Sequence, residues 1–143
     1  KPHPPRNQTP VAQTSTSRPS KTVFAIAGAC VALMAVVSNK ADMAVQELCK
    51  DYFDGLFDFA VGEREGVRRK PAPDAVEHVL DTLQITKKDA VYIGDSEVDV
   101  QTAINAGLDS VIVLWGFRER ELLEQYGAKV FAQDTKECLR LLQ

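Results

Sequence analysis

The sequence predicts an α/β fold in which a parallel sheet lies between two layers of helices, a three-layer α/β/α architecture. Short, continuous apolar runs alternate along the chain with longer helix-like segments, and such runs are typical of strands that are buried on both faces. Polar residues that suit anion or metal binding directly follow several of these runs. Because ligands of parallel α/β sheets bind beyond the carboxyl ends of the strands, both observations favour the same architecture.

The first predicted elements lie between residues 33 and 83. Residues 33–37 form an apolar run without a polar side chain, which indicates a buried strand. A helix-like segment follows at residues 41–52, and a short strand follows at residues 57–61. A proline can begin a helix because its missing N–H is not needed in the first turn, so Pro73 predicts a helix over residues 73–83.

The same alternation continues to the end of the chain. Residues 90–93 form a continuous apolar strand, and a helix over residues 97–106 ends at Gly107, since glycine is favoured just past a helix C-terminus. The remaining predicted elements are strands at residues 110–114 and 130–132 and helices at residues 118–126 and 134–142. No internal repeat is evident.

The composition is that of one globular domain. The chain has 143 residues, of which 45% are hydrophobic and 26% are charged. The formal net charge of -3 hides an asymmetry, because residues 1–41 contain five basic and no acidic residues whereas all 20 acidic residues follow. A nucleic-acid partner needs clustered Lys and Arg, so the acidic body predicts no nucleic-acid binding.

The N-terminal segments differ from the rest of the chain. Residues 1–21 are rich in Pro, Ser, Thr and Gln with little to bury, which predicts a disordered leader, and the folded core is predicted over residues 22–143. Residues 22–37 are an apolar run that is shorter than the roughly 20 residues needed to cross a bilayer, so no membrane span is predicted. The apolar core of a secretory signal peptide is an alternative for this run.

The cysteines favour a reducing, cytoplasmic setting. Cys30, Cys49 and Cys138 are odd in number and lack the paired spacing of a zinc site. They are predicted to be small buried side chains.

The segment Gly94-Asp95-Ser96-Glu97-Val98-Asp99 carries the strongest chemical signal. Asp95 directly follows a predicted strand and Asp99 lies four residues further, so both carboxylates can face one point beyond the sheet. Two carboxylates on a rigid strand-to-helix junction suit Mg²⁺, which completes its coordination with water and phosphate oxygens. The alternative is a capping box, in which Ser96 is the N-cap and Asp99 occupies the third helical position.

Two further polar groups lie on the same predicted edge. Lys70 precedes Pro71, which favours an extended Lys70, and an ammonium held there can bind a phosphoryl group. Arg68 and Arg69 beside it are more simply explained as a solvated basic loop.

Ser38 and Asn39 follow the predicted strand at residues 33–37 and precede a helix, which is a natural anion site. The alternative for this pair is a plain N-cap of the helix that begins at residue 41.

Taken in this order, the three features resemble the haloacid dehalogenase superfamily, and within it the phosphoglycolate phosphatase-like branch, over residues 33–143. The segments that carry the resemblance are Val36-Val37-Ser38-Asn39-Lys40, Arg69-Lys70-Pro71-Ala72-Pro73-Asp74, Tyr92-Ile93-Gly94-Asp95-Ser96 and Val113-Leu114-Trp115-Gly116-Phe117-Arg118.

The resemblance implies a Rossmann-like core and a Mg²⁺-dependent phosphoric monoester hydrolase that acts on a small phosphorylated metabolite such as 2-phosphoglycolate. It implies that Ser38 binds the phosphoryl oxygens with support from Asn39, and that Lys70 stabilises the nucleophile and the phosphoryl charge. It further implies that Asp95 binds Mg²⁺ and that Asp99 supports either the metal or Lys70.

The sequence departs from the family in its first motif. The family attacks phosphate with an aspartate of an Asp-x-Asp-Gly motif at the end of the first strand, and no such motif is present, since Asp42 is the first acidic residue. Residues 23–28 have the shape of that motif with alanine at both aspartate positions; alternatively, residues 22–32 imitate the helix before the second strand. The family's cap domain is also absent, because Gly28 and Ser38 are close in sequence.

The missing motif leaves several hypotheses open. Residues 22–28 fill the position of the family's central strand, or the chain is a fragment that folds poorly. Functionally, the alternatives are a catalytically inactive domain that still binds phosphate and Mg²⁺, and a different doubly wound module. A nucleotide-binding module is disfavoured because neither G-x-G-x-x-G nor G-x-x-x-x-G-K-[ST] occurs. The sequence does not specify the oligomeric state.

Overall fold

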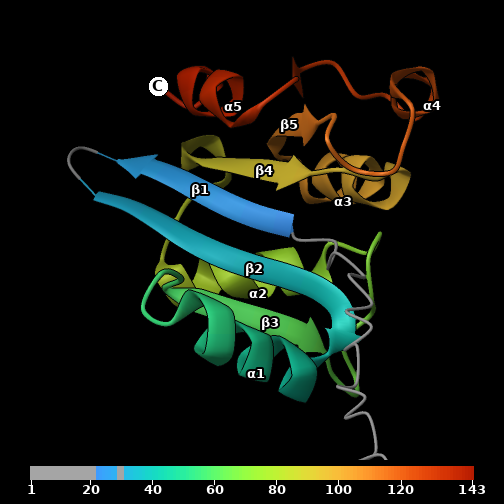
Figure 1. Cartoon of the computed structure of the whole chain (residues 1–143). Coiled ribbons are helices and arrows are strands. Elements are labelled where there is room, and N and C mark those ends of the chain that lie inside the picture. Colours follow the sequence, from blue (N-terminus) through green and yellow to red (C-terminus); the bar gives the residue numbers. More distant parts are fainter. Residues whose placement is uncertain (1–21, 29–30) are drawn as a thin grey trace, which may run out of the picture.

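The computed structural model describes residues 22–28 and 31–143, which form a six-stranded sheet flanked by helices (Figure 1). The strands follow the spatial order β3-β2-β1-β4-β5-β6. Their bounds are β1 Thr22–Gly28, β2 Val31–Ala41, β3 Phe59–Glu63, β4 Ala90–Gly94, β5 Asp109–Val113 and β6 Phe131–Ala132. The helices are α1 Asp42–Phe53, α2 Asp74–Leu83, α3 Glu97–Ala106, α4 Arg120–Gln125 and α5 Thr135–Leu141, with one 3-10 turn at Lys87–Asp89.

The predicted α/β class is confirmed, and every element predicted from residue 33 onward is present. The bounds of α3 agree with the prediction at both ends, because Ser96 caps its start and Gly107 ends it with a left-handed backbone (φ 70°). Most other bounds differ by one or two residues. The hypothesis that residues 22–28 fill the central strand position is also confirmed, since β1 pairs with β2 on one side and with β4 on the other.

The direction of β1 corrects the prediction of a wholly parallel sheet. The other five strands run parallel to one another, whereas β1 is antiparallel to both of its neighbours (Figure 1). Only residues 29–30 separate β1 from β2, and strands joined so closely pair antiparallel, because a parallel pair needs a crossover of a dozen residues or more. Residues 22–28 and 31–32 are strand and not the helix-like segment of the alternative.

The reversed strand also removes one candidate for the family's first motif. Thr22 pairs with Val37, so the beginning of β1 lies at the edge where the parallel strands end. Gly28 pairs with Val31, so the end of β1 lies at the opposite edge. The interpretation of residues 23–28 as a degenerate nucleophile motif is therefore wrong in position.

The core is built from alternating side chains on the two faces of the sheet. On β4, Ala90 and Tyr92 pack towards α2 and α3, whereas Val91 and Ile93 pack in the cluster that includes Cys138 of α5. A third cluster lies between β5, α3 and α4 around Ile112 and Leu123. The completely buried position of Tyr92 places a hydroxyl inside the core and next to the carboxyl ends of the strands.

An irregularity in β2 shapes the carboxyl edge. The register with β3 joins Val37 to Val61 and then Ala41 to Glu63, so four steps along β2 correspond to two along β3. Residues 38–40 therefore bulge out of the ladder, as is common beside functional sites. The predicted strand ended at Val37, where the regular pairing does end.

The remaining expectations are met only in part. Residues 1–21 and Cys30 lie outside the described residues. Cys138 is buried as expected, whereas Cys49 is only partly buried, and both are free thiols. In the part of the chain that the structure describes, no helix is long and apolar enough to cross a membrane.

Candidate active site

A cavity of about 360 Å³ opens at the carboxyl ends of the parallel strands. It collects side chains from the end of β2, the loop before α2, the junction of β4 with α3, and the loop after β5. The residues that line it are Asn39, Lys70, Asp95, Ser96, Val98, Asp99, Phe117 and Arg118. Residues that are up to 79 positions apart in sequence thus meet at one edge, as the strand order requires.

The β4–α3 junction caps α3 and also lines this cavity. Ser96 is the N-cap of α3, and its Oγ accepts a hydrogen bond from the Asp99 backbone N–H at 3.3 Å. The Ser96 hydroxyl in turn donates to Asp99 Oδ2 at 2.8 Å. Asp99 Oδ2 also accepts the Asp95 backbone N–H at 3.1 Å. The capping alternative is therefore realised, and it fixes the acidic residues within the site.

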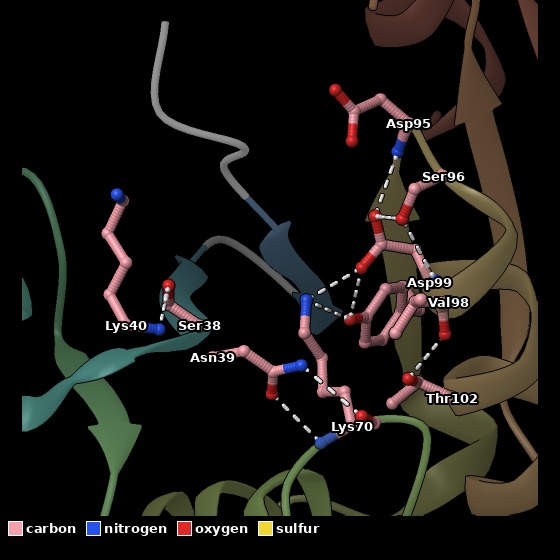
Figure 2. Close-up of polar contacts among 10 residues, drawn as sticks. Ser38, Asn39, Lys40, Lys70, Asp95, Ser96, Val98, Asp99 and Thr102 are labelled. Atoms are coloured by element: carbon pink, nitrogen blue, oxygen red, sulfur yellow. Dashed lines mark hydrogen bonds and ion pairs between the residues drawn. The ribbon is translucent and has the colours of Figure 1, made fainter. Parts of the chain in front are cut away.

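Asp99 is a buried carboxylate with both oxygens occupied. Oδ1 accepts from the Lys70 Nζ at 2.7 Å and from the Tyr92 hydroxyl at 3.0 Å, while Oδ2 accepts the two donors of the junction (Figure 2). Only 1% of Asp99 is exposed. Of the two roles implied for Asp99, support of the metal or of Lys70, this geometry favours the support of Lys70.

Lys70 is held at both its backbone and its ammonium group. The Asn39 side chain accepts the Lys70 N–H at 2.9 Å and donates to the Lys70 carbonyl at 3.2 Å. The ammonium contacts Asp99 and, at 3.5 Å, the Tyr92 hydroxyl, and only 7% of the Lys70 side chain is exposed. The Lys70–Pro71 peptide bond is cis. The amide of Asn39 thus anchors the lysine loop, a task distinct from the phosphate contact implied for it.

The neighbouring arginines are surface residues, as the solvated-loop interpretation expects. Arg68 forms an ion pair with Asp74 at 2.8 Å, and Arg69 lies 3.7 Å from Glu63. The Arg68 guanidinium lowers the pKa of the partly exposed Asp74 carboxyl. Both arginines are solvated, and neither lines the cavity.

Ser38 lies apart from this cluster. Its Oγ accepts the Lys40 backbone N–H at 3.1 Å, and Figure 2 shows the two residues away from Asp95. Ser38 is absent from the residues that line the cavity, and it is not the N-cap of α1, a position that Ala41 occupies. The structure therefore brings Asn39, Lys70, Asp95 and Asp99 together but leaves Ser38 outside.

The Asp95 carboxyl is the acidic group of the cavity that points away from the buried network (Figure 2). Burial raises its pKa, and the negative charge of Asp99 raises it further, while the Lys70 ammonium opposes this effect. A divalent cation beside Asp95 would relieve the same repulsion.

The cavity can offer Mg²⁺ one protein ligand, the carboxylate of Asp95. Mg²⁺ takes one or two carboxylates and keeps several waters or phosphate oxygens. Within the described residues, no three His, Cys, Asp or Glu side chains are grouped so that they could hold a metal ion, so any such site depends on Asp95 with ligands from water and substrate.

Two glycines allow the close approach of these segments. A Cβ on Gly94 would collide with the Asp99 Cβ, so a side chain there would displace the buried carboxylate. A Cβ on Gly116, in the loop after β5, would lie 2.7 Å from Asp95 Oδ2. Both positions therefore require glycine for packing reasons alone.

Sequence reasoning missed Tyr92 and Gly116 as parts of the site. The signal for Tyr92 was a tyrosine within an apolar strand two residues before Gly94, since a buried hydroxyl needs a partner and alternate strand residues share a face. Gly116, Phe117 and Arg118 lie in a segment that carries the family resemblance, but no role at the site was predicted for them.

Comparison with known proteins identifies the family. A profile described as haloacid dehalogenase-like hydrolase matches residues 23–113, which is most of the described chain. The chain belongs to the haloacid dehalogenase-like hydrolases. The resemblance inferred from the motifs is thereby confirmed.

Several similar proteins are named as phosphatases or pyrophosphatases. A protein from Caldanaerobacter subterraneus, provisionally named a pyrophosphatase, is 32% identical over 108 residues, which cover 76% of this chain and 49% of the relative. A phosphoglycolate phosphatase from Colwellia psychrerythraea is 30% identical over 66% of this chain and 42% of its own length. The chain thus spans about half the length of the curated relatives it matches.

Solved structures agree with the fold. A crystal structure from Lactobacillus delbrueckii subsp. bulgaricus, provisionally assigned as a phosphoglycolate phosphatase, shares 45% identity with a TM-score of 0.73 and is matched over 76% of this chain and 45% of that one. A haloacid dehalogenase-like hydrolase from Streptococcus pneumoniae shares 25% identity with a TM-score of 0.68, over 76% of this chain and 51% of that one.

Proposed function

We propose that this chain supplies the phosphate-binding and Mg²⁺-binding side of a phosphatase active site that acts on small phosphomonoesters, similar to the phosphoglycolate phosphatases. One observation carries the proposal: an ammonium group and an outward-facing carboxylate, Lys70 and Asp95, line one cavity and are both fixed through Asp99. A fixed cation can bind the phosphoryl oxygens, and the carboxylate can hold the metal that bridges to them. A cytoplasmic setting, which the free thiols of Cys49 and Cys138 favour, is part of the same proposal.

Lys70 acts as a positioned point charge. Its loop is clamped by Asn39 and its ammonium by Asp99, so little side-chain freedom is lost when a phosphoryl group binds. A preorganised charge of this kind costs no rearrangement as negative charge moves onto the phosphoryl oxygens. The Tyr92 hydroxyl supports Asp99 from within the core and keeps the ion pair in place.

Asp95 is the residue that would hold Mg²⁺. The ion supplies positive charge that offsets the charge of a phosphoryl group. The protein's own part is to aim the carboxylate outward, which it does because the Asp95 backbone N–H is bonded to Asp99 and the loop at Gly116 packs against the Asp95 side chain.

The attacking carboxylate of a phosphoaspartyl mechanism is not among the described residues that line the cavity. Asp95 and Asp99 are the carboxylates there, and the second is fully engaged. The site as described thus provides binding and charge stabilisation. Whether the chain also turns over substrate separates the phosphatase proposal from an inactive domain that binds phosphate and Mg²⁺.

The test has two parts, binding and turnover. Binding is measured as the rise in melting temperature that inorganic phosphate and MgCl₂ produce, since a ligand that binds only the folded state at 100 times its Kd adds about 2.7 kcal/mol of stability. Turnover is measured with p-nitrophenyl phosphate and MgCl₂. We expect the binding signal in the wild type, and we expect Asp95→Asn to abolish its Mg²⁺-dependent part. Turnover would require an attacking group other than the two described carboxylates of the cavity.

Asp81→Asn is the matched control, because Asp81 is an exposed acid on α2 outside the cavity. It is expected to behave as the wild type does. Stabilisation by phosphate without turnover would favour the inactive binding domain. Stabilisation that is indifferent to both Mg²⁺ and Asp95 would contradict the proposed metal site.

A further inference from the structure

Phe117 is an exposed aromatic side chain that nevertheless lines the cavity. It is 78% exposed, which makes it the most exposed of the large apolar side chains in the described chain. The ring belongs to the loop after β5 and stands with Val98 on a cavity whose other lining residues are polar or charged. Exposed single apolar residues are common, so its position on this cavity is the informative fact.

The backbone of Phe117 is anchored on both sides. Arg118 donates two hydrogen bonds to Glu97 in the first turn of α3, at 2.7 and 3.0 Å. On the other side, Gly116 packs so closely on Asp95 that a Cβ would collide with that carboxylate. The loop therefore carries the ring at a fixed place relative to Asp95, whereas nothing described in the structure covers its outer face.

The cations that line the cavity are already ion-paired, so we expect the Phe117 ring to contact the leaving group. Among the described lining residues the cations are Lys70 and Arg118, and each is already ion-paired, with Asp99 and Glu97 respectively. The part of a substrate beyond its phosphoryl group would therefore find the Phe117 ring but, among the described lining residues, no cation that lacks an ion-pair partner. An exposed ring that becomes covered by a ligand contributes apolar burial and stacking.

We propose that Phe117 is a specificity-determining residue that packs against the leaving group of the phosphomonoester and favours leaving groups with an apolar or aromatic portion. This inference rests on the proposed function, because the phosphoryl group must bind beside Lys70 and Asp95 for the leaving group to reach the ring.

The test compares two stable phosphonates that differ only in the group beyond the phosphorus. Methylphosphonate and phenylphosphonate are titrated into the whole chain by calorimetry in MgCl₂, with inorganic phosphate as the reference ligand. We expect phenylphosphonate to bind about 3- to 10-fold more tightly than methylphosphonate, the range typical of one aromatic contact. Phe117→Ala is expected to remove that preference while inorganic phosphate binds as it does to the wild type.

Tyr52→Ala is the matched control, because Tyr52 is a similarly exposed aromatic (72%) on α1 that does not line the cavity. It is expected to retain the preference for phenylphosphonate. Equal affinities of the two phosphonates in the wild type, or an unchanged preference in Phe117→Ala, would overturn this inference and leave the proposed function standing. Failure of inorganic phosphate and of both phosphonates to bind would overturn the proposed function and this inference together.

Discussion

The buried ion pair of Lys70 with Asp99 should show a strong and unequal energetic coupling. The perturbation is a double-mutant cycle with Lys70→Met, Asp99→Asn and the double variant. The pair is nearly buried, with side-chain exposures of 7% and 2% and an N–O distance of 2.7 Å. Removing one member of a buried pair typically costs about 3–5 kcal/mol, because the other charge stays in a poorly solvated place.

The two single variants should differ because their hydrogen bonding differs. In Lys70→Met the Asp99 carboxylate still accepts from Tyr92, Ser96 and the Asp95 N–H, so we expect a loss of about 1–2 kcal/mol. In Asp99→Asn a nearly buried ammonium loses the opposing charge, and one acceptor oxygen becomes an NH₂ group that faces hydrogen-bond donors in either orientation of the amide. We therefore expect a loss of about 3–5 kcal/mol.

The assay is urea denaturation followed by circular dichroism, with the free energy of unfolding extrapolated to water. The double variant should be more stable than the sum of the single losses implies, by at least about 1 kcal/mol, since it buries no lone charge. The exposed pair of Arg120 and Glu124 is the control, where a cycle should give less than about 0.5 kcal/mol. Additive losses at Lys70 and Asp99, or an equal cost for the two single variants, would refute the reasoning.

Three further predictions concern other parts of the chain. Gly116→Ala should weaken Mg²⁺ binding at least about tenfold in a calorimetric titration, because the new methyl group would lie 2.7 Å from Asp95 Oδ2, and unchanged affinity would contradict the close packing of this loop. Asp42→Asn should cost less than about 1 kcal/mol at pH 7, because the amide oxygen can still accept the Gly62 N–H, bonded at 2.8 Å, but carries no negative charge. That hydrogen bond is the main cause that lowers the pKa of the partly exposed Asp42 carboxyl. Because the pKa of Asp42 is lower in the folded state, its ionised carboxylate stabilises the fold above the ordinary pKa of about 3.9, and this stabilisation is lost as the pH falls through the folded-state pKa. The difference in stability between the variant and the wild type should therefore shrink below about pH 4. A difference that does not depend on pH would rule out this hydrogen bond as its source. Cys138 should resist thiol reagents until the protein unfolds in urea, because burial raises the pKa of its thiol, and rapid labelling in native buffer, located by mass spectrometry, would argue against its place in the core.

The order and type of the elements could be predicted because most strands contain a continuous apolar run and two helices have a recognisable start or end, at Pro73 and at Ser96 and Gly107. The helix at Glu97–Ala106 was predicted most closely, since a serine cap and a following glycine bound it. The direction of β1 could not be predicted from its composition, because an apolar strand is compatible with either direction. What decides it is the length of the connection to β2, a constraint between elements that the pattern within each element does not contain.

The sequence predicted the site residues that the strand ends bring together, but it did not predict which hydrogen-bond partner each side chain has. Lys70, Asp95 and Asp99 line one cavity as expected, because parallel strands bring their carboxyl ends to one edge. The hydroxyl of Ser38 was expected to face the same point, yet it bonds to the Lys40 N–H within the bulge of β2. Serine side chains often satisfy nearby backbone groups in this way, and spacing alone does not reveal which partner prevails.

The capping and metal-site interpretations of Gly94–Asp99 are compatible, because the arrangement that caps α3 also leaves the Asp95 carboxyl on the cavity. Ser96 caps α3 and thereby holds Asp99 against β4. Asp99, fixed in this way, orients the Lys70 ammonium and the backbone of Asp95 at the same time. One buried side chain, that of Asp99, therefore sets the distance between the Lys70 ammonium and the outward-facing Asp95 carboxylate. A substitution at Asp99 should disturb phosphate binding and metal binding together, although both Asp99 oxygens are already engaged within the protein.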